Sequence, residues 1–416
     1  MRAALMSGCG CSSSMLRPVD EAIAALLERV PGVPEIETVS LQDALGRTLA
    51  ETLQAPFAVP AWDNSAMDGY ALRAADLPAE GGCLPLAGRI AAGDAADTCL
   101  PAGCAVRIFT GAPLPPGADS VVAQEDCQLQ GEQVCLPPVQ AGQHVRRRAE
   151  EVDAGAALLA PGQRLRAQEI GLLASFGIAR VQVYRRLRVA VLSSGNELRE
   201  PGESLAPGQI YNTNRITLAS VLRGWGLQVL EYPNIPDDPA QTRAALSRAA
   251  SEADVLLSSG GVSVGEEDHL KQAIEALGQL HLWRLAIQPG KPLAFGEVAG
   301  KPWLGLPGNP AAALITALVV GRPFLLRCQG VERVLPTPLR LPAGFAWSKA
   351  NVRRQYLRAR FVVAEEGQAS VQLHPRQGSA MLSSACWADG LAVLECQRTL
   401  QPGDWVDYLP FSELLG

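Results

Sequence analysis

Two adjacent glycines after a short apolar run form the first stretch with an evident chemical use. The run Val255–Leu257 has the length and composition of a strand buried on both faces, and Ser258-Ser259-Gly260-Gly261 follows it. Ser263 and an acidic cluster ending at Asp268 then lead into a segment with helical spacing. In a strand, glycine loop and helix unit, loop amides face an anion and the helix start adds partial positive charge. The stretch is either an oxyanion site or an ordinary tight turn, and it matches neither GxxxxGK[ST] nor GxGxxG.

The motif PAWDNSAMDGYAL, residues 60–72, is the second candidate. It places Asp63, Asn64, Ser65 and Asp68 between two aromatic residues. Such residues often only make turns. Two carboxylates with an amide and a hydroxyl in one loop also suit a hard cation or a sugar-phosphate.

Two further stretches offer groups that suit an anion. In RIFTGAPLPPGAD, Thr110 and Gly111 come directly after a strand-like run and offer a hydroxyl and backbone amides. In HVRRRAEEVDAG, Arg146 opens a run of three arginines. That run is either a solvated interface strip or a phosphate-recognition element, because arginine forks match phosphate oxygens.

Residues 187–330 alternate between strand and helix patterns, which predicts a parallel sheet covered by helices on both faces. Ligands of such sheets bind beyond the carboxyl ends of the strands. Four loops rich in Gly, Pro, Ser and Asn follow predicted strand ends, at residues 193–197, 258–268, 288–291 and 306–310. They carry Glu197 and Asp268, which suit a metal, and Lys291. Together they predict a cleft that handles phosphate or pyrophosphate.

The rest of the chain supplies a framework for these loops. We expect helices in residues 19–30 and 40–53, the second capped by Ser40. The texture of the sequence predicts the following division: a flexible leader at 1–14, a discontinuous scaffold domain at 15–55 and 149–186, a β domain at 56–148, the α/β domain at 187–330 and a C-terminal β domain at 331–416.

Composition excludes several classes of function. The chain of 416 residues has a net charge of −6, and no basic run dominates a domain, which disfavours nucleic-acid binding. Its 10 cysteines include no CxxC pair, and we therefore expect the protein to reside in the reducing cytoplasm. Cys9 and Cys11 are interpreted as incidental thiols, although a metal-binding CxC is the alternative. We expect no apolar run long enough to span a membrane.

Taken together, eight motifs occur in the order and spacing found in molybdopterin molybdenumtransferases, the MoeA family, which is related to the gephyrin E domain. They are PAWDNSAMDGYAL, RIFTGAPLPPGAD, VRRRAEE, SSGNEL, QIYNTNR, SSGGVSVGEED, PGKPLAFG and GLPGNP. The resemblance extends from about residue 17 to the C-terminus. It implies an elongated homodimer with a scaffold domain, a β domain, a molybdopterin-binding α/β domain and a C-terminal β-barrel.

The resemblance also implies a reaction and roles for individual residues. Molybdenum from molybdate is transferred to adenylylated molybdopterin, with release of AMP and with a divalent cation, taken as Mg²⁺. Asp63, Glu197 and Asp268 would hold the metal, and Lys291 with the Pro307–Pro310 turn would steady the pterin dithiolene or molybdate. The implied substrate-binding residues are Asn64, Ser65, Asp68, Thr110, Gly111, Arg146, Ser259, Gly260, Gly261, Ser263, Pro307, Gly308, Asn309, Pro310, Arg353 and Ser379.

Four residues depart from the family pattern. Asn196, Asn212 and Glu151 stand where Asp is usual, and Gln288 stands where Lys is usual. Asn and Gln keep shape and hydrogen bonding but lose charge. These departures leave open a specialised paralogue, for instance one that favours tungstate. A carrier or scaffold that binds molybdopterin without turnover is a separate alternative, which loss of the set Asp63, Glu197 and Asp268 would favour, and the set is intact. A third alternative, a molybdopterin adenylyltransferase, is disfavoured because such an enzyme would not need the β domain that carries Asp63. Separately, a molybdopterin adenylyltransferase and molybdoenzyme maturation proteins are possible partners.

Overall fold

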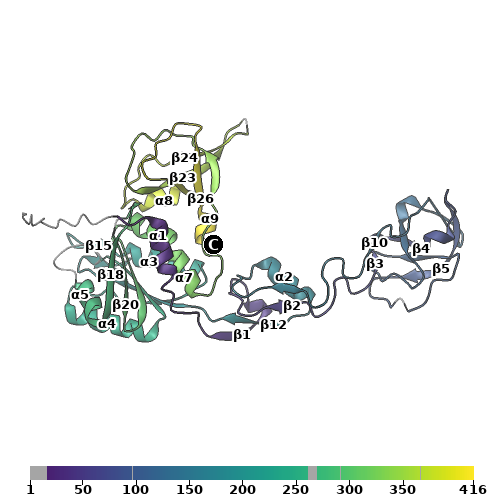
Figure 1. Ribbon diagram of the computed structural model, residues 1–416, viewed down its shortest axis with the longest axis horizontal. Helices are drawn as coiled ribbons and strands as arrows, with labels where there is room; N and C mark the ends of the chain where they lie inside the picture. The colour runs from purple at the N-terminus through teal and green to yellow at the C-terminus, as the bar shows by residue number, and fades with distance from the viewer. Residues whose placement is uncertain (1–15, 96, 261–268, 291, 366) are drawn as a thin grey trace, which may run out of the picture. The chain divides into compact units, whose positions relative to one another are not determined.

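The computed structural model describes residues 16–95, 97–260, 269–290, 292–365 and 367–416 (Figure 1). Contacts divide the chain into two compact units, and each is described by itself. The larger unit comprises Met1–Ala50, Pro161–Ile170 and Arg180–Gly416, and the smaller one comprises Glu51–Ala160 and Gly171–Ala179. The finer division into four domains stays a prediction.

A six-stranded sheet forms the centre of the larger unit, in the order β16-β13-β17-β21-β20-β18. Its strands are β13 (Arg188–Ser193), β16 (Gln228–Glu231), β17 (Val255–Ser259), β18 (Gly278–Arg284), β20 (Pro292–Val298) and β21 (Lys301–Leu306). The first four strands in the order are parallel, as predicted, whereas β20 and β18 pair antiparallel. The antiparallel edge arises because only Ala299 and Gly300, both with positive φ, join β20 to β21. Such a turn makes a hairpin, since a parallel connection needs a long crossover.

Helices cover both faces of this sheet. They are α3 (Thr213–Gly224), α4 (Pro239–Glu252), α5 (His269–Leu277), α6 (Pro310–Thr316) and α7 (Arg322–Cys328). Alternate residues of β13 face opposite cores: Val189 and Val191 pack with α3, α6 and α7, whereas Ala190 and Leu192 pack with α4 and α5 (Figure 1). The side chain of Asp238 accepts a hydrogen bond from the Gln241 amide, so it caps α4 as the sequence suggests.

The segment from Pro310 to Cys328 is one continuous helix of 19 residues, in which a π-helical stretch, Ala317–Gly321, joins α6 to α7. By length and composition alone it could cross a membrane, so the expectation that no segment would reach this length is wrong. Arg322 and Arg327 interrupt its apolar pattern in the sequence. Burial within the protein of 89% of its apolar window explains its composition, as in the core helix of a folded domain.

The C-terminal part of the larger unit forms a second sheet. Its strands are β22 (Leu339–Pro342), β23 (Arg354–Val363), β24 (Ala369–Leu373), β25 (Gly390–Leu394) and β26 (Trp405–Pro410), with short helices α8 (Leu382–Trp387) and α9 (Phe411–Leu415). After β18 the chain leaves the central sheet, and the next strand, β19 (Ile287–Gln288), pairs with β23 of the C-terminal sheet. The two sheets are therefore joined by a shared strand connection as well as by packing.

The N-terminal segment of the larger unit corrects one sequence prediction. Helix α1 (Val19–Leu27) forms as expected, and β1 (Ile36–Ser40) pairs with β12 (Arg180–Tyr184). The helix predicted for residues 40–53 is only a 3-10 turn, Leu41–Asp43, although Ser40 does cap it. Its continuation is lost because the backbone of the following residues pairs with distant segments, including Leu49 with Gln163 and Ala50 with Gln182.

The smaller unit contains a six-stranded sheet in the order β7-β4-β6-β5-β9-β8. The strands are β4 (Gly69–Leu72), β5 (Gly82–Ile90), β6 (Ala105–Ile108), β7 (Ser120–Ala123), β8 (Gln128–Gln130) and β9 (Gln133–Leu136). The hairpin predicted near Gly131 joins β8 to β9. The short strands β2 (Leu53–Gln54) and β11 (Ala157–Leu159) pair with each other, and α2 (Ala167–Ser175) ends within this unit.

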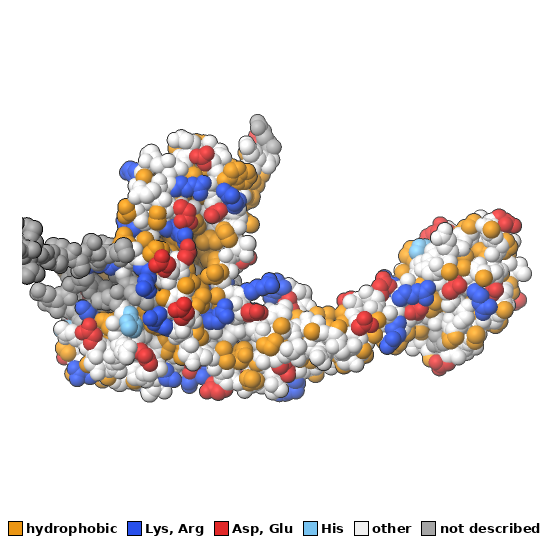
Figure 2. Space-filling view, viewed as in Figure 1, with side chains coloured by type: hydrophobic (Ala, Val, Ile, Leu, Met, Phe, Trp, Pro, Cys, Tyr) orange, Lys and Arg blue, Asp and Glu red, His pale blue; other side chains and the backbone are white. Residues whose placement is uncertain are grey.

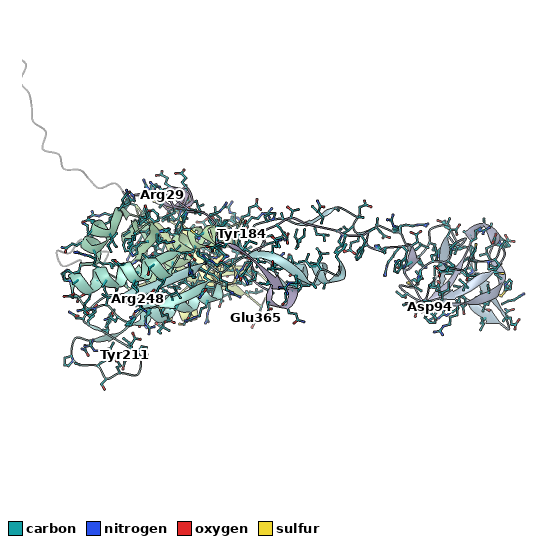
Figure 3. All side chains as sticks on the ribbon, turned by 90° about the horizontal axis from the view of Figure 1, so that it is seen from below. Arg29, Asp94, Tyr184, Tyr211, Arg248 and Glu365 are labelled. Carbon is teal, nitrogen blue, oxygen red and sulfur yellow. A yellow bond between two sulfur atoms is a disulfide. The ribbon has the colours of Figure 1, made fainter. Side chains whose placement is uncertain are left out.

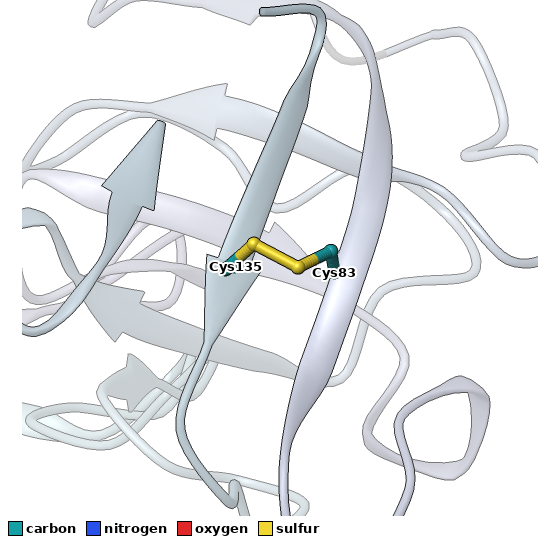
Figure 4. The surroundings of a disulfide bond; sticks show 2 residues. All are labelled: Cys83 and Cys135. Atoms are coloured by element: carbon teal, nitrogen blue, oxygen red, sulfur yellow. A yellow bond between two sulfur atoms is a disulfide. The ribbon is translucent and has the colours of Figure 1, made fainter. Parts of the chain in front are cut away.

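A disulfide joins Cys83 on β5 to Cys135 on β9 (Figure 4). The two residues are direct partners in the antiparallel register, although 52 residues separate them in the sequence. The sequence analysis did not predict this bridge, because only the strand pairing brings the two cysteines together.

A half-buried ion cluster stabilises the start of β17 and gives a testable prediction. Asp254, whose side chain is 15% exposed, accepts hydrogen bonds from Arg185 at 2.6 and 3.0 Å and from the Arg188 amide at 2.8 Å. Burial raises the pKa of Asp254, but the hydrogen bonds from Arg185 and Arg188 lower it more, so it lies well below the usual range. The carboxylate therefore contributes stability above its unfolded pKa of about 3.9, which is lost as the pH falls through the lower folded pKa.

We expect Asp254→Asn to lower the free energy of unfolding by about 2 kcal/mol at pH 7, because charge-assisted hydrogen bonds are lost. The difference from the wild-type protein should shrink between pH 4 and pH 2, as measured by urea unfolding. Glu35→Gln is the control, since Glu35 contacts the same Arg185 but its side chain is 77% exposed, and it should change stability little. A constant difference across this pH range would contradict the assignment.

Candidate functional site

Three neighbouring parallel strands, β13, β17 and β21, end at the same edge of the central sheet. The loops that follow them meet there, as predicted from the sequence. They border a cavity of about 560 Å³. Its described lining consists of Ser194, Glu197, Leu198, Leu205, Ile210, Tyr211, Asn212, Thr213, Asn214, Ser259, Gly260, Gly308, Asn309, Pro310 and Ala380. Six of the predicted site residues are among them: Glu197, Ser259, Gly260, Gly308, Asn309 and Pro310.

Glycines allow these loops to approach one another closely. Gly260 has a φ of +83°, and its amide donates to the carbonyl of Leu306 at 3.2 Å, so β17 and β21 stay paired up to the loop. A Cβ on Gly308 would lie 3.6 Å from the Cα of Gly260, an ordinary van der Waals distance, so the two glycines are near neighbours at the cavity. Gly195 has a φ of +143°, and a Cβ there would lie 2.3 Å from Oε2 of Glu197. The Glu197 carboxylate therefore lies against the backbone of its own loop, where it borders the cavity.

The start of α3 supplies cavity residues that our reasoning about strand ends did not include. Asn212 is 1% exposed, and its Oδ1 accepts a hydrogen bond from the Arg215 amide at 3.2 Å, so it caps the helix. Asn214 donates from Nδ2 to the carbonyl of Gly308 at 2.7 Å, which ties α3 to the loop after β21. Tyr211, in the short strand β15 (Ile210–Tyr211) before α3, is labelled in Figure 3. The Asn-Thr-Asn run before an apolar helix pattern is an N-cap signal that could have located this wall.

The C-terminal sheet contributes the wall near Ala380. The Nδ2 atom of Asn309 donates to Oγ of Ser379 at 3.1 Å, and the amide of Ala312 donates to the Ser379 carbonyl at 3.0 Å. Pro310 begins α6 as expected, but the Asn309 side chain makes no capping hydrogen bond. The Asn309 side chain instead donates its hydrogen bond to Ser379, which is a predicted site residue.

The loop at residues 288–290 reaches this region by a different route from the one predicted. It follows β19, which belongs to the C-terminal sheet, and precedes β20, whose first residue lies at the same edge as the end of β21. Oε1 of Gln288 accepts a hydrogen bond from Asn351 at 2.6 Å, and Asn351 in turn accepts one from the Arg353 amide at 3.0 Å. Arg353 therefore lies beside this loop but is not part of the described cavity lining.

In the smaller unit, the structure brings seven predicted residues together. Asp63, Asn64, Ser65, Asp68, Thr110, Gly111 and Arg146 come from neighbouring strands and loops. Strands β3 (Asn64–Ser65) and β10 (Val145–Arg146) pair directly, and the Gly111 amide donates to the Ser65 carbonyl at 2.8 Å. Oδ1 of Asp68 accepts from both the amide and the hydroxyl of Thr110, each at 2.8 Å. These hydrogen bonds keep the pKa of Asp68 below its usual value.

Asp63 has partners that the sequence analysis did not assign. Its carboxylate accepts hydrogen bonds at 2.7 Å from the Arg148 amide and from the Arg147 guanidinium. Partial burial raises the pKa of Asp63, but these two hydrogen bonds lower it more, and the net shift is downward. The arginine that pairs with Asp63 is thus Arg147, and the Arg146 side chain remains exposed.

A metal ion would find part of a binding site among these residues. Within the described ranges, no group of three His, Cys, Asp or Glu side chains could hold a metal. Gly261, Ser263, Asp268 and Lys291 lie outside the described residues, so the structure gives no account of them. Magnesium typically uses one or two carboxylates together with phosphate oxygens and water. Glu197 at the cavity wall fits that mode of binding, in which the substrate completes the site.

Comparisons with known proteins agree with this geometry. Three family descriptions match successive parts of the chain: "MoeA N-terminal region (domain I and II)" over residues 17–177, "Probable molybdopterin binding domain" over 190–327 and "MoeA C-terminal region (domain IV)" over 340–411. The cavity described above lies mainly within the second of these regions.

Relatives of the chain match almost all of it. A molybdopterin molybdenumtransferase from Haemophilus influenzae is 39% identical and covers 96% of this chain and 99% of its own length. The corresponding protein from Synechococcus elongatus is 36% identical over 91% of this chain and 96% of its own length. A molybdopterin biosynthesis moeA protein from Pyrococcus horikoshii has a similar structure, with a TM-score of 0.81 at 26% identity, covering 95% of this chain and 100% of that one.

These matches confirm the resemblance inferred from the motifs, together with the multidomain fold of α/β and β parts that it implies. The chain therefore belongs to the molybdopterin molybdenumtransferase family, the MoeA family, whose enzymes act in molybdenum cofactor biosynthesis.

Proposed function

We propose that the protein transfers molybdenum from molybdate to adenylylated molybdopterin and releases AMP. The observation that carries this proposal is the convergence of Glu197, the Gly260 loop and the Gly308 loop on one cavity at the carboxyl edge of parallel strands. The family resemblance assigns Gly260, Gly261 and Ser263 to the phosphates of the substrate, and the helix that starts at Pro310, on the cavity wall, adds partial positive charge at the same edge. In the reaction, an oxygen of molybdate attacks the adenylyl phosphorus and the pyrophosphate P–O bond breaks, which gives adenylyl-molybdate and molybdopterin with its own phosphate. The two dithiolene sulfurs of molybdopterin then form bonds to molybdenum and lose their protons, the Mo–O bond to AMP breaks, and AMP leaves.

The chemistry requires no nucleophile from the protein, since molybdate supplies it. The described cavity lining contains neither cysteine nor histidine, in keeping with that requirement. Mg²⁺, held by Glu197 and Asp268 with the substrate phosphates, would neutralise the charge that develops during transfer. Glu197 keeps its carboxylate at the wall, the loop amides orient the phosphates, and the Leu198 and Ile210 side chains offer apolar contact to the pterin.

The remaining predicted residues are assigned by the family resemblance. We propose that Lys291 and the Pro307–Pro310 turn steady the pterin dithiolene or molybdate. In a homodimer, Asp63 of the partner subunit would complete the metal site, after exchanging a contact with Arg147 or Arg148. Arg353 and Ser379 would close the pocket from the C-terminal sheet.

We also propose that the protein binds a small molecule and neither a nucleic acid nor a membrane. We propose a cytoplasmic location for it. On the face seen in Figure 2, positive and negative side chains are interspersed over both units. An extended basic stripe would instead be expected for nucleic-acid binding. For a chain of net charge −6, binding a polyanion depends on local amides and a cation, because the overall charge opposes it.

The first test of the proposal uses Glu197→Gln. The purified protein is incubated with adenylylated molybdopterin and Mg²⁺, and AMP release is followed with and without molybdate. We expect the wild-type protein to release AMP only with molybdate, and the variant to do so at least about tenfold more slowly, because it lacks a carboxylate for the metal. Asp268→Asn should behave in the same way.

Glu365→Gln is the matched control for charge, since Glu365 lies in the exposed turn between β23 and β24 (Figure 3). It should leave the rate unchanged. Tight binding of adenylylated molybdopterin by the wild-type protein, with no AMP release in molybdate or tungstate, would instead indicate a carrier or scaffold. AMP release with tungstate but not molybdate would identify a tungstate-specific paralogue.

A second prediction concerns the backbone of the Gly260 loop. Gly260→Ala should reduce stability by about 1 kcal/mol, because alanine is strained at a φ of +83°. It should also raise KM for adenylylated molybdopterin severalfold, since the strain displaces Gly260 from its place in the cavity wall.

Gly403→Ala provides the matched control for this strain. Gly403 has a φ of +92°, and a Cβ there would meet nothing within 4 Å. Thermal unfolding of the two variants should show similar losses of stability, whereas only Gly260→Ala should change KM. Equal KM values in the two variants would show that the Gly260 loop does not contact the substrate.

A further inference from the structure

A fully buried arginine lies directly behind the cavity wall that the C-terminal sheet provides. Arg358, on β23, has an exposed fraction of 0%, and no carboxylate pairs with it among the described residues. One of its terminal nitrogens, Nη1, is buried with no hydrogen-bond partner in the described structure. Burial lowers the pKa of Arg358 to about 10, which still leaves it charged at neutral pH. Burying an unpaired charge is strongly unfavourable, so the retention of this arginine calls for a reason other than stability.

The hydrogen bonds of Arg358 point to that reason. Its Nε donates to Oγ of Ser384 at 2.9 Å, and its Nη2 donates to the carbonyl of Gly378, also at 2.9 Å. Its backbone amide and carbonyl are both bound by the side-chain amide of Gln377, at 2.9 and 3.0 Å. Arg358 thus fixes both ends of residues 377–384, which we call the wall segment.

The other side of the wall segment faces the cavity. Ser379 accepts hydrogen bonds from Asn309 and Ala312 at the start of α6, and Ala380 lines the cavity itself. The neighbouring residues of β23, Leu357 and Ala359, belong to the opposite, apolar core. The arginine is therefore on the one face of β23 from which it can reach the wall segment.

We propose that Arg358 is a positioning residue of the substrate cavity, which holds the wall segment so that Ser379 and Ala380 present a fixed surface to the ligand. The inference rests on the proposed function, because it takes adenylylated molybdopterin as the ligand of that cavity. The planar fork of arginine suits this role, since two nitrogens at a fixed spacing reach two acceptors at opposite ends of the segment.

The first experiment separates binding from stability in Arg358→Met, which keeps a long side chain and removes the buried charge. Equilibrium dialysis gives Kd for adenylylated molybdopterin, and thermal unfolding gives Tm. We expect Kd to rise at least tenfold while Tm stays the same or increases, because an apolar residue replaces an unpaired charge. An unchanged Kd, or a fall in Tm in step with the loss of binding, would overturn the proposal.

Arg360→Met is the matched control. Arg360 lies two residues further along β23, and it binds the far end of α8, with its guanidinium 4.4 Å from the centre of the Trp387 ring. It makes no contact with Gly378 or Ser384 among the interactions described. Its Kd should stay within twofold of the wild-type value, and a loss equal to that of Arg358→Met would overturn the specific role of Arg358.

Two more variants keep the test decisive. Ser384→Ala removes one of the acceptors of Arg358 without changing the arginine, and we expect it to raise Kd severalfold. This variant therefore tests the proposal independently if Arg358→Met fails to fold. Arg358→Lys keeps the charge but lacks the second nitrogen, so it should not restore binding, and full restoration would show that charge alone matters. These comparisons of Kd do not need turnover, so a wild-type protein that binds substrate without releasing AMP contradicts only the proposed function.

Discussion

The parallel pairing of β13, β17 and β21 is the constraint on which the candidate site depends. Because these strands run in the same direction and are neighbours, their carboxyl ends meet at one edge, whatever the sequence of the loops. A glycine lies in each of these loops, at positions 195, 260 and 308, and positive φ angles of +143° and +83° account for the first two. Glu197 owes its place at the cavity wall to this arrangement, and the start of α3 is fixed there by the bond from Asn214 to Gly308.

The C-terminal sheet is tied to the same edge by polar contacts rather than by loop proximity alone. The Asn309 side chain binds Ser379 instead of capping α6. The Gln288 side chain accepts hydrogen bonds from Asn351 and Gln355. The Asn309 contact joins a loop of the central sheet to the C-terminal part, whereas the contacts of Gln288 lie within the C-terminal sheet, because Gln288 belongs to β19. A displacement of that sheet would therefore alter the cavity wall, even though the loops after β13, β17 and β21 belong to the central sheet.

Local sequence signals predicted most of the central sheet, since its helix caps and buried strands carry strong patterns. The turn at Ala299-Gly300 was the local feature that decided the antiparallel edge, and it was overlooked. Other features were beyond such signals. The pairing of Leu49 with Gln163, the bridge between Cys83 and Cys135, and the contact of Asp63 with Arg147 all join residues distant in the chain. Three of the four loops predicted from strand ends border the cavity, whereas the wall from α3 and Ala380 depends on tertiary packing.

The departures from the family pattern acquire a physical meaning in the structure. Asn212 is almost completely buried and caps α3, and an ionised aspartate there would have to be desolvated. Gln288 binds Asn351 and Gln355 through its carbonyl oxygen, an interaction that a lysine could not make. Asn196 and Asp237 exchange two hydrogen bonds between side chains and backbone amides. The side chains of these three residues therefore shape loops in the larger unit, while Glu197 still lines the cavity, so their loss of charge is compatible with the cavity described above.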